Sequence, residues 1–403
     1  MSVLNILEEK LAETKKQGRF REFLNLERGV QDKPWATSHG HHGERRLNVW
    51  CSNDYLAMSH HPKVLLATTE AVNRVGLGTC GARSISGTSV YHSELETLLA
   101  SAYGKESALL FTTGFGANDA TLSTLCDAIP DLIVFSDELN HASMIYGIRY
   151  SKAEEKIFRH NDVAHLAELL QAADPARPKL IAFESLYSMD GDFAPLAQIV
   201  ALAEQYQALT YLDEIHSAGV YGERGLGYAE QLGLLDKITI IQGGFGKSYG
   251  AAGGYIAAPR SVVEAVRSWA PAFVFSTSSP APVVAAALAS FKYNLEHDTQ
   301  RKHLLAIVDH LKTGLRAAGI PLVSADSHIL PLRVGDPHRN KHISKVLLDE
   351  HDIYVQPVNA PTVPAGSERL RVTPTSAHSH ADVETFLAAL GRVWAANDLR
   401  RAG

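Results

Sequence analysis

Apolar and polar positions alternate with two different periods in the middle of this chain. Between residues 107 and 257, short apolar runs typical of buried strands are separated by amphipathic stretches such as VAHLAELLQAA and LAQIVALAEQYQ. The runs are ALLF, DLIVFS, EKIF, KLIAFES, LTYLDE, KITIIQ and GGYIAA. Strands that alternate with helices are typical of a mostly parallel sheet covered on both faces. The pattern predicts an α/β fold.

The segments before this region predict an N-terminal helix, a loop and a short strand. Apolar residues from Leu4 to Leu11 indicate an amphipathic helix that ends near Gly18. Residues 31–47 are polar and rich in Gly, His and Pro, which predicts a loop. The stretch LNVWCSNDYLAM predicts a strand and a turn, and Pro62 begins a helix.

The pattern changes again after Pro280, where long helices are followed by short strands. Strands are expected in HILPLRV, IYVQPV and RLRVT, with one helix near HISKVLLDEHD and a final helix in ADVETFLAALGRVWAAN. This order predicts a smaller α+β lobe. The expected divisions are an N-terminal helix and arm over 1–47, a large domain over 48–285 and a small domain over 286–403.

Composition narrows the function classes. The 403 residues are 45% hydrophobic and 20% charged, enough for a sizeable core and a second lobe. A net charge of -6 argues against nucleic-acid binding. No apolar run is long enough to span a membrane, and the N-terminus lacks the apolar centre of a signal peptide. The composition predicts a cytoplasmic protein that binds neither nucleic acid nor membrane.

Polar residues follow four of the predicted strands. In a parallel sheet, ligands bind beyond the carboxyl ends of the strands. Each residue also has a purely structural interpretation: Asp213 as a helix cap, His216 as a buried and hydrogen-bonded histidine, and Ser188 as part of a turn. Their joint placement predicts an active site at this edge. The residues are Ser136, His141, Ser185, Ser188, Asp213, His216 and Lys247.

The stretch GGFGKSYG places Lys247 just after a buried strand. An amine in an apolar site favours its neutral, nucleophilic form and can form a Schiff base with an aldehyde. The surrounding residues suit pyridoxal 5'-phosphate (PLP): Asp213 for the pyridine nitrogen, His216 and Ser188 for the ring oxygen, and His141 for stacking.

The phosphate of such a cofactor requires backbone donors. In TTGFGAND, Gly114 and Phe115 begin a predicted helix whose free N–H groups and dipole favour an anion. A plain helix cap is the alternative interpretation of this stretch.

Long motifs along the chain, in order, carry a family resemblance. They include NDYLAMSHHP, FSDELNHASMI, RPKLIAFESLYSMDGDFAPL, LTYLDEIHSAGVYG and IYVQPVNAPTVPAGSERLRVTPT. These motifs resemble those of the PLP-dependent α-oxoamine synthases, and among them the 5-aminolevulinate synthases. The resemblance extends from GRFREF to the last helix. It implies a fold-type I, aspartate aminotransferase-like architecture with a seven-stranded sheet, and a homodimer with shared active sites.

The resemblance also implies roles for individual residues. Lys247 is then the Schiff-base lysine, with Asp213, His141, His216 and Ser188 around the cofactor ring as above. The resemblance places Ser276 and Thr277 at the phosphate of the neighbouring subunit.

The implied substrate contacts involve two arginines. Arg371 binds the amino-acid carboxylate, a task that suits a guanidinium fork. Arg21 and Thr362 recognise the succinyl carboxylate; without the resemblance, Arg21 is an ordinary solvated charge. The implied substrate pocket also includes Ala82, Ser84 and Ser136.

The implied reaction is a decarboxylative Claisen-type condensation. An amino acid, glycine in the family, reacts with an acyl-CoA, succinyl-CoA in the most similar enzymes, to give an aminoketone, CoA and carbon dioxide. A non-catalytic PLP protein would lose substrate contacts such as Arg371. An aminotransferase would transfer the amine to a keto acid and release no CoA.

Four positions depart from the usual pattern of 5-aminolevulinate synthases. Ala82 and Ser84 replace a threonine and an asparagine, because CGARSISGT stands where GGTRNISGT is usual. Tyr146 replaces a glutamate, and Gly244 replaces the threonine of GTLGK. The alternative hypothesis is therefore an α-oxoamine synthase that uses a different amino acid or acyl thioester.

Overall fold

The computed structural model describes residues 2–40, 43–397 and 399. Its contacts divide the chain into two units. The central unit comprises Asp54–Ser188 and Phe193–Arg301, and the terminal unit comprises the residues up to Asn53, Met189–Asp192 and the residues from Lys302 on. No helix among the described residues is both long and apolar enough to cross a membrane.

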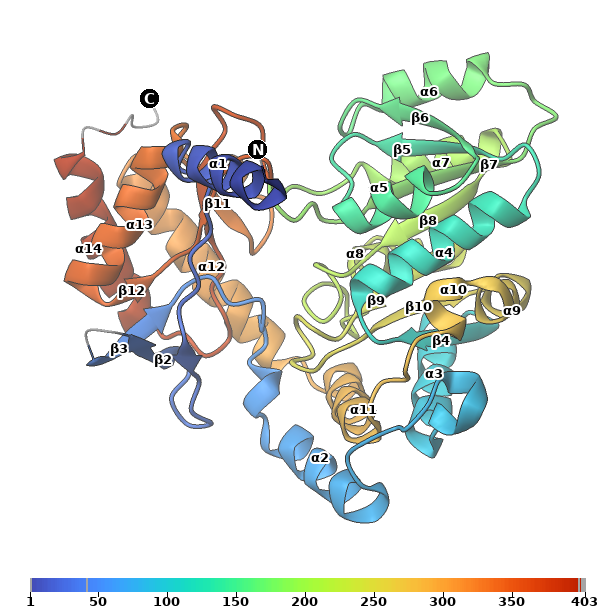
Figure 1. Ribbon diagram of the computed structural model, residues 1–403, viewed down its shortest axis with the longest axis horizontal. Coiled ribbons are helices and arrows are strands. Elements are labelled where there is room, and N and C mark those ends of the chain that lie inside the picture. Colours follow the sequence, from blue (N-terminus) through green and yellow to red (C-terminus); the bar gives the residue numbers. More distant parts are fainter. Residues whose placement is uncertain (1, 41–42, 398, 400–403) are drawn as a thin grey trace. The chain divides into compact units, whose positions relative to one another are not determined.

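The central unit is built on a seven-stranded sheet with the order β4-β10-β9-β8-β7-β5-β6 (Figure 1). Strand β10 runs antiparallel to both of its neighbours, and the pairs from β9 to β6 are parallel. The strands are β4 (Ser107–Phe111), β5 (Ile133–Asp137), β6 (Glu154–Phe158), β7 (Lys179–Glu184), β8 (Leu209–Asp213), β9 (Ile240–Gly244) and β10 (Gly254–Ala258). Each coincides with one predicted apolar run, and the fold class is confirmed.

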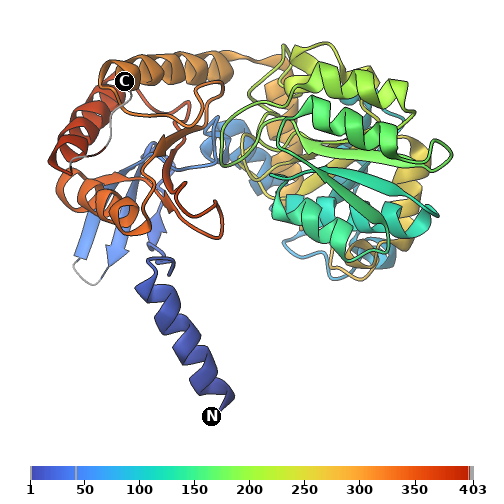
Figure 2. The same ribbon diagram turned by 90° about the horizontal axis from the view of Figure 1, so that it is seen from above.

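Helices cover both faces of this sheet (Figure 2). Consecutive strand residues point to opposite faces, so Ala182 and Phe183 of β7 belong to different cores. One core contains α4 (Gly114–Ala128), α5 (Ala142–Arg149), α9 (Arg260–Trp269) and α10 (Pro271–Val274). The other contains α3 (Val90–Tyr103), α6 (Val163–Ala172), α7 (Leu196–Gln205), α8 (Tyr228–Gln231) and α11 (Ala281–Glu296). Burial on both faces explains why the strands are continuously apolar.

The terminal unit contains two small sheets and a helical layer. One sheet has the order β1-β2-β3-β12 and the other β11-β14-β13. The strands are β1 (Leu26–Glu27), β2 (Trp35–Gly40), β3 (Gly43–Val49), β11 (Leu330–Arg333), β12 (Ile353–Tyr354), β13 (Pro357–Val358) and β14 (Arg369–Val372). A shared core joins Trp50 to α12 (Thr299–Ala317), α13 (Pro337–His351) and α14 (His380–Ala396). Helix α1 (Val3–Lys16) buries no residue in the single chain.

The predicted loop over 31–47 is wrong, because this segment contains most of an antiparallel hairpin. Strand β2 pairs with β3 from Trp35 opposite Asn48 to Gly40 opposite Gly43. Residues 41 and 42 lie outside the described residues. Only Ala36 and Leu47 are fully buried within the paired segment up to residue 47. A hairpin with so few buried apolar positions lacks the alternation that predicts strands.

The division into units also differs from the expected domain boundaries. Helix α11 spans residue 285 and packs against α2 (Pro62–Val75) and α3, so the central unit continues to Arg301. The N-terminal segment up to Asn53 shares the core of the C-terminal part instead of forming a separate arm, because β3 pairs with β12 and Trp50 packs on Phe386.

The packing of the central sheet predicts a large loss of stability when a buried side chain is shortened. Leu180 in β7 is fully buried, whereas Leu66 on α2 is 59% exposed. We expect Leu180→Ala to lower the free energy of unfolding by about 2–5 kcal/mol, because it leaves a cavity. Leu66→Ala is the control and should cost less than about 1 kcal/mol. Equal losses in urea titrations of the two variants would contradict this packing.

Candidate active site

The structure brings the predicted strand-exit residues together at one edge of the central sheet. Strands β5, β7, β8 and β9 are parallel, so their carboxyl ends meet there. Ser136 lies in β5 and is buried, and Asn140 donates a hydrogen bond to its hydroxyl at 3.0 Å. Ser188 lies in the turn that follows β7.

Asp213 is a buried carboxylate with two donors. The backbone N–H of Ile215 donates to Oδ1 at 2.8 Å, and Asn118 Nδ2 donates to Oδ2 at 2.8 Å. Burial raises the pKa of Asp213, whereas these hydrogen bonds and the charges of His141 and Lys247 lower it. A buried carboxylate held in this way is suited to pair with a protonated ring nitrogen.

Asn118 links Asp213 to His141. Its Oδ1 accepts a hydrogen bond from Tyr211 at 2.7 Å, and its Nδ2 also donates to Ser143 Oγ at 2.9 Å. The Ser143 hydroxyl lies 2.7 Å from His141 Nδ1, and the Ser143 backbone N–H donates to the same nitrogen at 3.2 Å. Because Nδ1 is an acceptor here, neutral His141 carries its proton on Nε2. Burial lowers the pKa of His141, which favours this neutral form.

Glu184 is a second buried carboxyl beside Asp213. The two residues are partners in the register of β7 and β8. Burial, and then repulsion by Asp213, raise the pKa of Glu184 well above its ordinary value, while the backbone N–H of His141 lowers it. Glu184 Oε1 has no hydrogen-bond partner among the described residues, whereas both oxygens of Asp213 have donors. The pKa of Glu184 is raised more strongly than that of Asp213, which favours protonation of Glu184 and the charged form of Asp213.

Lys247 lies in a tight segment between β9 and β10. Backbone hydrogen bonds close this segment from Gly250 to Lys247 and from Ala251 to Phe245, both at 2.9 Å. Gly250 has a φ of +61°, and a Cβ there would lie 2.0 Å from the backbone nitrogen of Ser59. Only glycine fits this close approach. The backbone thus holds Lys247 at the edge that carries Asp213.

His216 has a fixed orientation as well. It is 4% exposed, and its Nδ1 lies 2.9 Å from the hydroxyl of Tyr55. The structure therefore places His216 at the exit of β8, directly after the hydrogen-bonded Ile215, as the sequence predicts.

Two of the residues predicted at the phosphate, Ser276 and Thr277, border a small cavity near the start of α4. Thr113 caps α4 by accepting a hydrogen bond from Gly116 at 2.9 Å, so the cap interpretation also holds. A cavity of about 30 Å³ is lined by Thr112 and Gly116 near the start of α4 and by Ser276 and Thr277 from the segment after α10. Gly114 is the first residue of this helix, and the side chain of Phe115 is 46% exposed.

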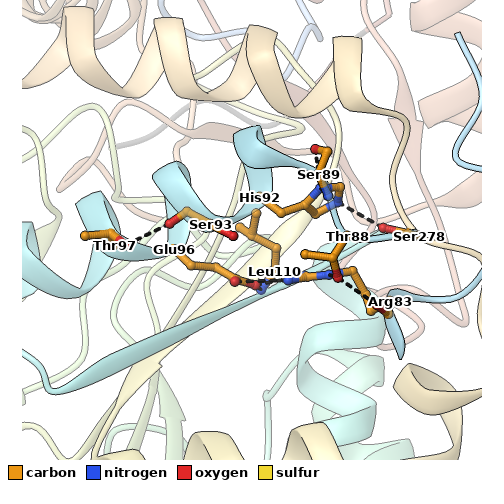
Figure 3. A network of polar contacts seen from close by, with 9 residues as sticks. All are labelled: Arg83, Thr88, Ser89, His92, Ser93, Glu96, Thr97, Leu110 and Ser278. Carbon is orange, nitrogen blue, oxygen red and sulfur yellow. Dashed lines mark hydrogen bonds and ion pairs between the residues drawn. The ribbon is translucent and has the colours of Figure 1, made fainter. Parts of the chain in front are cut away.

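A polar network fixes the segment that carries Ala82 and Ser84 (Figure 3). Arg83, between them, forms two hydrogen bonds with Glu96 of α3, at 2.8 and 3.0 Å. Glu96 also accepts a hydrogen bond from the backbone of Leu110 in β4 at 2.9 Å. This bidentate pair ties the segment to a helix and to the sheet.

The same segment is tied to residues 277–278. Thr277 forms a bridge with Ala82, and Ser278 donates its backbone N–H to Gly81 at 3.0 Å. The hydroxyl of Ser278 lies 2.9 Å from Nε2 of His92, whose pKa burial lowers to about 4 (Figure 3). The segment that carries Ala82 and Ser84 is thus connected to the segment that carries Thr277, and Ser84 is exposed.

The terminal unit contains the two predicted substrate arginines. Arg371 in β14 is 7% exposed, and its Nη1 donates to Asn53 Oδ1 at 3.0 Å. Arg21 donates to the hydroxyl of Thr362 at 2.9 Å. The structure therefore pairs Arg21 with Thr362, as expected of two residues that would contact one carboxylate.

Tyr146, one of the four departures, belongs to an exposed aromatic group. Its ring centroid lies 6.3 Å from that of Phe115 and 5.8 Å from that of Tyr150, on which it stacks. Phe115 in turn lies 6.4 Å from His141. A glutamate at position 146 would not form these contacts.

Several site residues escaped the sequence analysis. Asn118, Ser143 and Glu184 are not the first polar residues after a strand, and Tyr55 lies far away in the sequence. All four lie within motifs quoted above, NDYLAMSHHP, TTGFGAND, FSDELNHASMI and RPKLIAFESLYSMDGDFAPL, but the sequence analysis gave them no role. A search for polar residues one turn into the helices at this edge would have found Asn118 and Ser143.

Comparison with known proteins identifies the family. The model of the class I and II aminotransferases matches residues 46–390. A 5-aminolevulinate synthase of Rhodobacter capsulatus is 48% identical over 395 residues, which cover 96% of this chain and 95% of that protein. The chain belongs to the α-oxoamine synthases of this aminotransferase family. The family resemblance seen in the sequence is confirmed.

Further relatives of this α-oxoamine synthase agree. A 5-aminolevulinate synthase of Rhizobium meliloti is 49% identical over 386 residues, with 96% of each chain covered. Among solved structures, one titled as SPT with PLP has a TM-score of 0.92 at 31% identity and covers 99% of this chain and 100% of that chain. A serine palmitoyltransferase of Sphingomonas wittichii has a TM-score of 0.91 at 30% identity, with 99% and 100% covered.

The hydrogen bond from Asn118 predicts a pH dependence of stability. The raised pKa of Asp213 means that the folded chain binds more protons than the unfolded chain above about pH 4, so the free energy of unfolding falls as pH rises through the folded-state pKa. Asn118→Ala removes a donor that lowers this pKa, so the fall should extend to higher pH and reach about 1–3 kcal/mol.

Urea unfolding of the cofactor-free chain at several pH values measures this effect. Asn73→Ala on the exposed face of α2 is the control, and its curve should run parallel to that of the wild type. A parallel curve for Asn118→Ala would show that Asn118 does not control the charge of Asp213.

The Arg83–Glu96 pair predicts the mobility of the segment over residues 81–88. Glu96→Gln should speed backbone amide exchange there by about tenfold, because a charge-assisted bidentate pair is lost. Glu94→Gln on the same helix breaks an exposed pair with Lys292 and serves as the control. Hydrogen–deuterium exchange that changes equally in both variants would argue against this anchoring role.

Proposed function

We propose that this chain catalyses the condensation of glycine with succinyl-CoA to 5-aminolevulinate, CoA and carbon dioxide, with PLP as its cofactor. The observation that carries the proposal is the buried Asp213 carboxylate, held by Asn118 and Ile215 and close enough to Lys247 and His141 to interact electrostatically with both. The relatives that are 48% identical over nearly the whole chain are named 5-aminolevulinate synthases, which supports these substrates.

The donors and acceptors of the central unit fit PLP. Asp213 would pair with the pyridine nitrogen, His141 would stack on the ring, and His216 and Ser188 would contact the ring oxygen. Gly114 and Phe115 would offer backbone N–H groups to the phosphate. In the proposed homodimer, Ser276 and Thr277 would contribute to the phosphate site of the neighbouring copy.

When bound, PLP supplies an aldehyde that joins an amine and a ring that withdraws electrons from the amino acid's α-carbon. Lys247 would hold this aldehyde, and its amine would move the α-proton of the amino acid. Asp213 would keep the ring nitrogen protonated, because the more strongly raised pKa of Glu184 favours the charged form of Asp213. His141, neutral and with its proton on Nε2, has an N–H to donate, and its ring would cover the cofactor.

Two arginines of the terminal unit would bind the substrate carboxylates. Arg371 would hold the carboxylate of glycine through its guanidinium fork. Arg21, with Thr362, would bind the succinyl carboxylate, and their hydrogen bond at 2.9 Å supports a common target. A cytoplasmic homodimer remains part of the proposal.

The comparisons favour glycine and succinyl-CoA over the alternative substrates that Ala82 and Ser84 suggest. A panel of amino acids and acyl-CoAs, assayed for CoA release and product mass, tests this choice. We expect glycine with succinyl-CoA to be the best pair, because Arg21 and Thr362 recognise a carboxylate.

A different best pair would overturn the substrate assignment, and amine transfer to a keto acid without CoA release would overturn the reaction class. Lys247→Ala is the matched inactive variant. It should lower the turnover by at least about 10³-fold, because no other amine of the site can move the α-proton.

A further inference from the structure

Ile215 lies between two residues of the proposed cofactor site, Asp213 and His216. Its backbone N–H donates to Asp213 Oδ1 at 2.8 Å, and its side chain is partly exposed. The side chain lies against two glycines from different segments. A Cβ at Gly114 would lie 2.5 Å from Ile215 Cδ1, and a Cβ at Gly244 would lie 2.7 Å from Cδ1 and 2.8 Å from Cγ1.

These two glycines belong to the segments that would hold opposite ends of the cofactor. Gly114 is the first residue of α4, where the phosphate is proposed to bind. Gly244 is the last residue of β9, three positions before Lys247. A single side chain therefore contacts the start of the phosphate segment and the start of the lysine segment.

The backbone at Gly114 is also closely packed against strand β10. A Cβ at Gly254 of β10 would lie 2.6 Å from the Cα of Gly114, so the backbone there is in close contact with the sheet. The Cδ1 atom of Ile215 can rotate away from a neighbour, but its Cγ1 is fixed by the stiff χ1 of a β-branched residue. A side chain at Gly244 would therefore collide with an atom that cannot move without cost.

We propose that Ile215 is a positioning residue for the cofactor: it sets the spacing between the phosphate segment at Gly114 and the lysine segment at Gly244. The inference rests on the proposed function, because it takes PLP as the bound group. Glycine at position 244 then leaves no empty space beside the cofactor, since Ile215 fills it. Residues 215 and 244 form a matched pair, because the large side chain of Ile215 packs against a position that has no side chain.

The pairing of residues 215 and 244 predicts that Ile215→Ala weakens PLP binding in the wild type and strengthens it in the Gly244→Ala variant. In the wild type, Ile215→Val and then Ile215→Ala should raise the dissociation constant of PLP step by step, by about three- to tenfold for the first step, because atoms are lost from a packed contact. Gly244→Ala should also weaken PLP binding, because its Cβ collides with Ile215. In the Gly244→Ala background, Ile215→Ala should instead restore PLP binding.

The measurements are PLP titrations followed by the visible absorbance of the bound cofactor, and the pH profile of that absorbance. The profile reports the surroundings of Lys247 and Asp213 and should shift in the Ile215 variants. Ile133→Val in β5, a buried residue of the same sheet, and Gly391→Ala in α14, where a Cβ meets open space, are the controls. Both should leave the dissociation constant within about twofold.

The outcomes separate this inference from the proposed function. Weaker PLP binding by Ile215→Ala in both backgrounds, or no change in either, overturns the positioning role even if glycine and succinyl-CoA are consumed. Failure of the wild type to bind PLP overturns both proposals. If Gly244→Ala does not fold, recovery of the folded state by the added Ile215→Ala supports the pairing, and no recovery overturns it.

Discussion

The charge of Asp213 is the constraint on which the candidate site depends. A carboxylate removed from water is unstable unless donors replace the water. The backbone at Ile215 and the amide of Asn118 supply two such donors, and the strongly raised pKa of the neighbouring Glu184 favours the charge on Asp213. The parallel order of β5, β7, β8 and β9 makes this possible, because it directs their carboxyl ends to one edge. The parallel strand order therefore determines both the local fold and the electrostatics of the site.

Much of the central sheet could be predicted because its strands are buried on both faces. Such a strand is a continuous apolar run, and all seven runs became strands. The hairpin of β2 and β3 could not be predicted, because only Ala36, Leu47, Asn48 and Val49 among its described residues are fully buried. Its stability comes from pairing and from contacts with β12, about 300 residues away, which no local pattern records.

The site was predictable to the extent that its residues directly follow strands. Asp213 is the last residue of β8, and His216 and Lys247 lie three residues after β8 and β9, so the structure places them at the same edge. Asn118 acts through a hydrogen bond to Asp213, which lies 95 residues further along the chain. Glu184 acts on Asp213 from the neighbouring strand. Such contacts follow from the order of strands in the sheet, which the apolar runs do not specify. Once the strand order is known, these helix and strand positions can be assigned to the electrostatic network around Asp213.

The same reasoning changes how the departures from the family pattern are understood. Taken one at a time, Gly244 for threonine suggests a lost contact and a wider pocket. In the structure the space is filled by Ile215, so the substitution concerns packing between two segments. Ala82 and Ser84 differ from this case, because they flank Arg83 in a segment whose backbone is held by Glu96 and Ser278. A change of side chain there leaves the segment in place and alters only what it presents to a substrate.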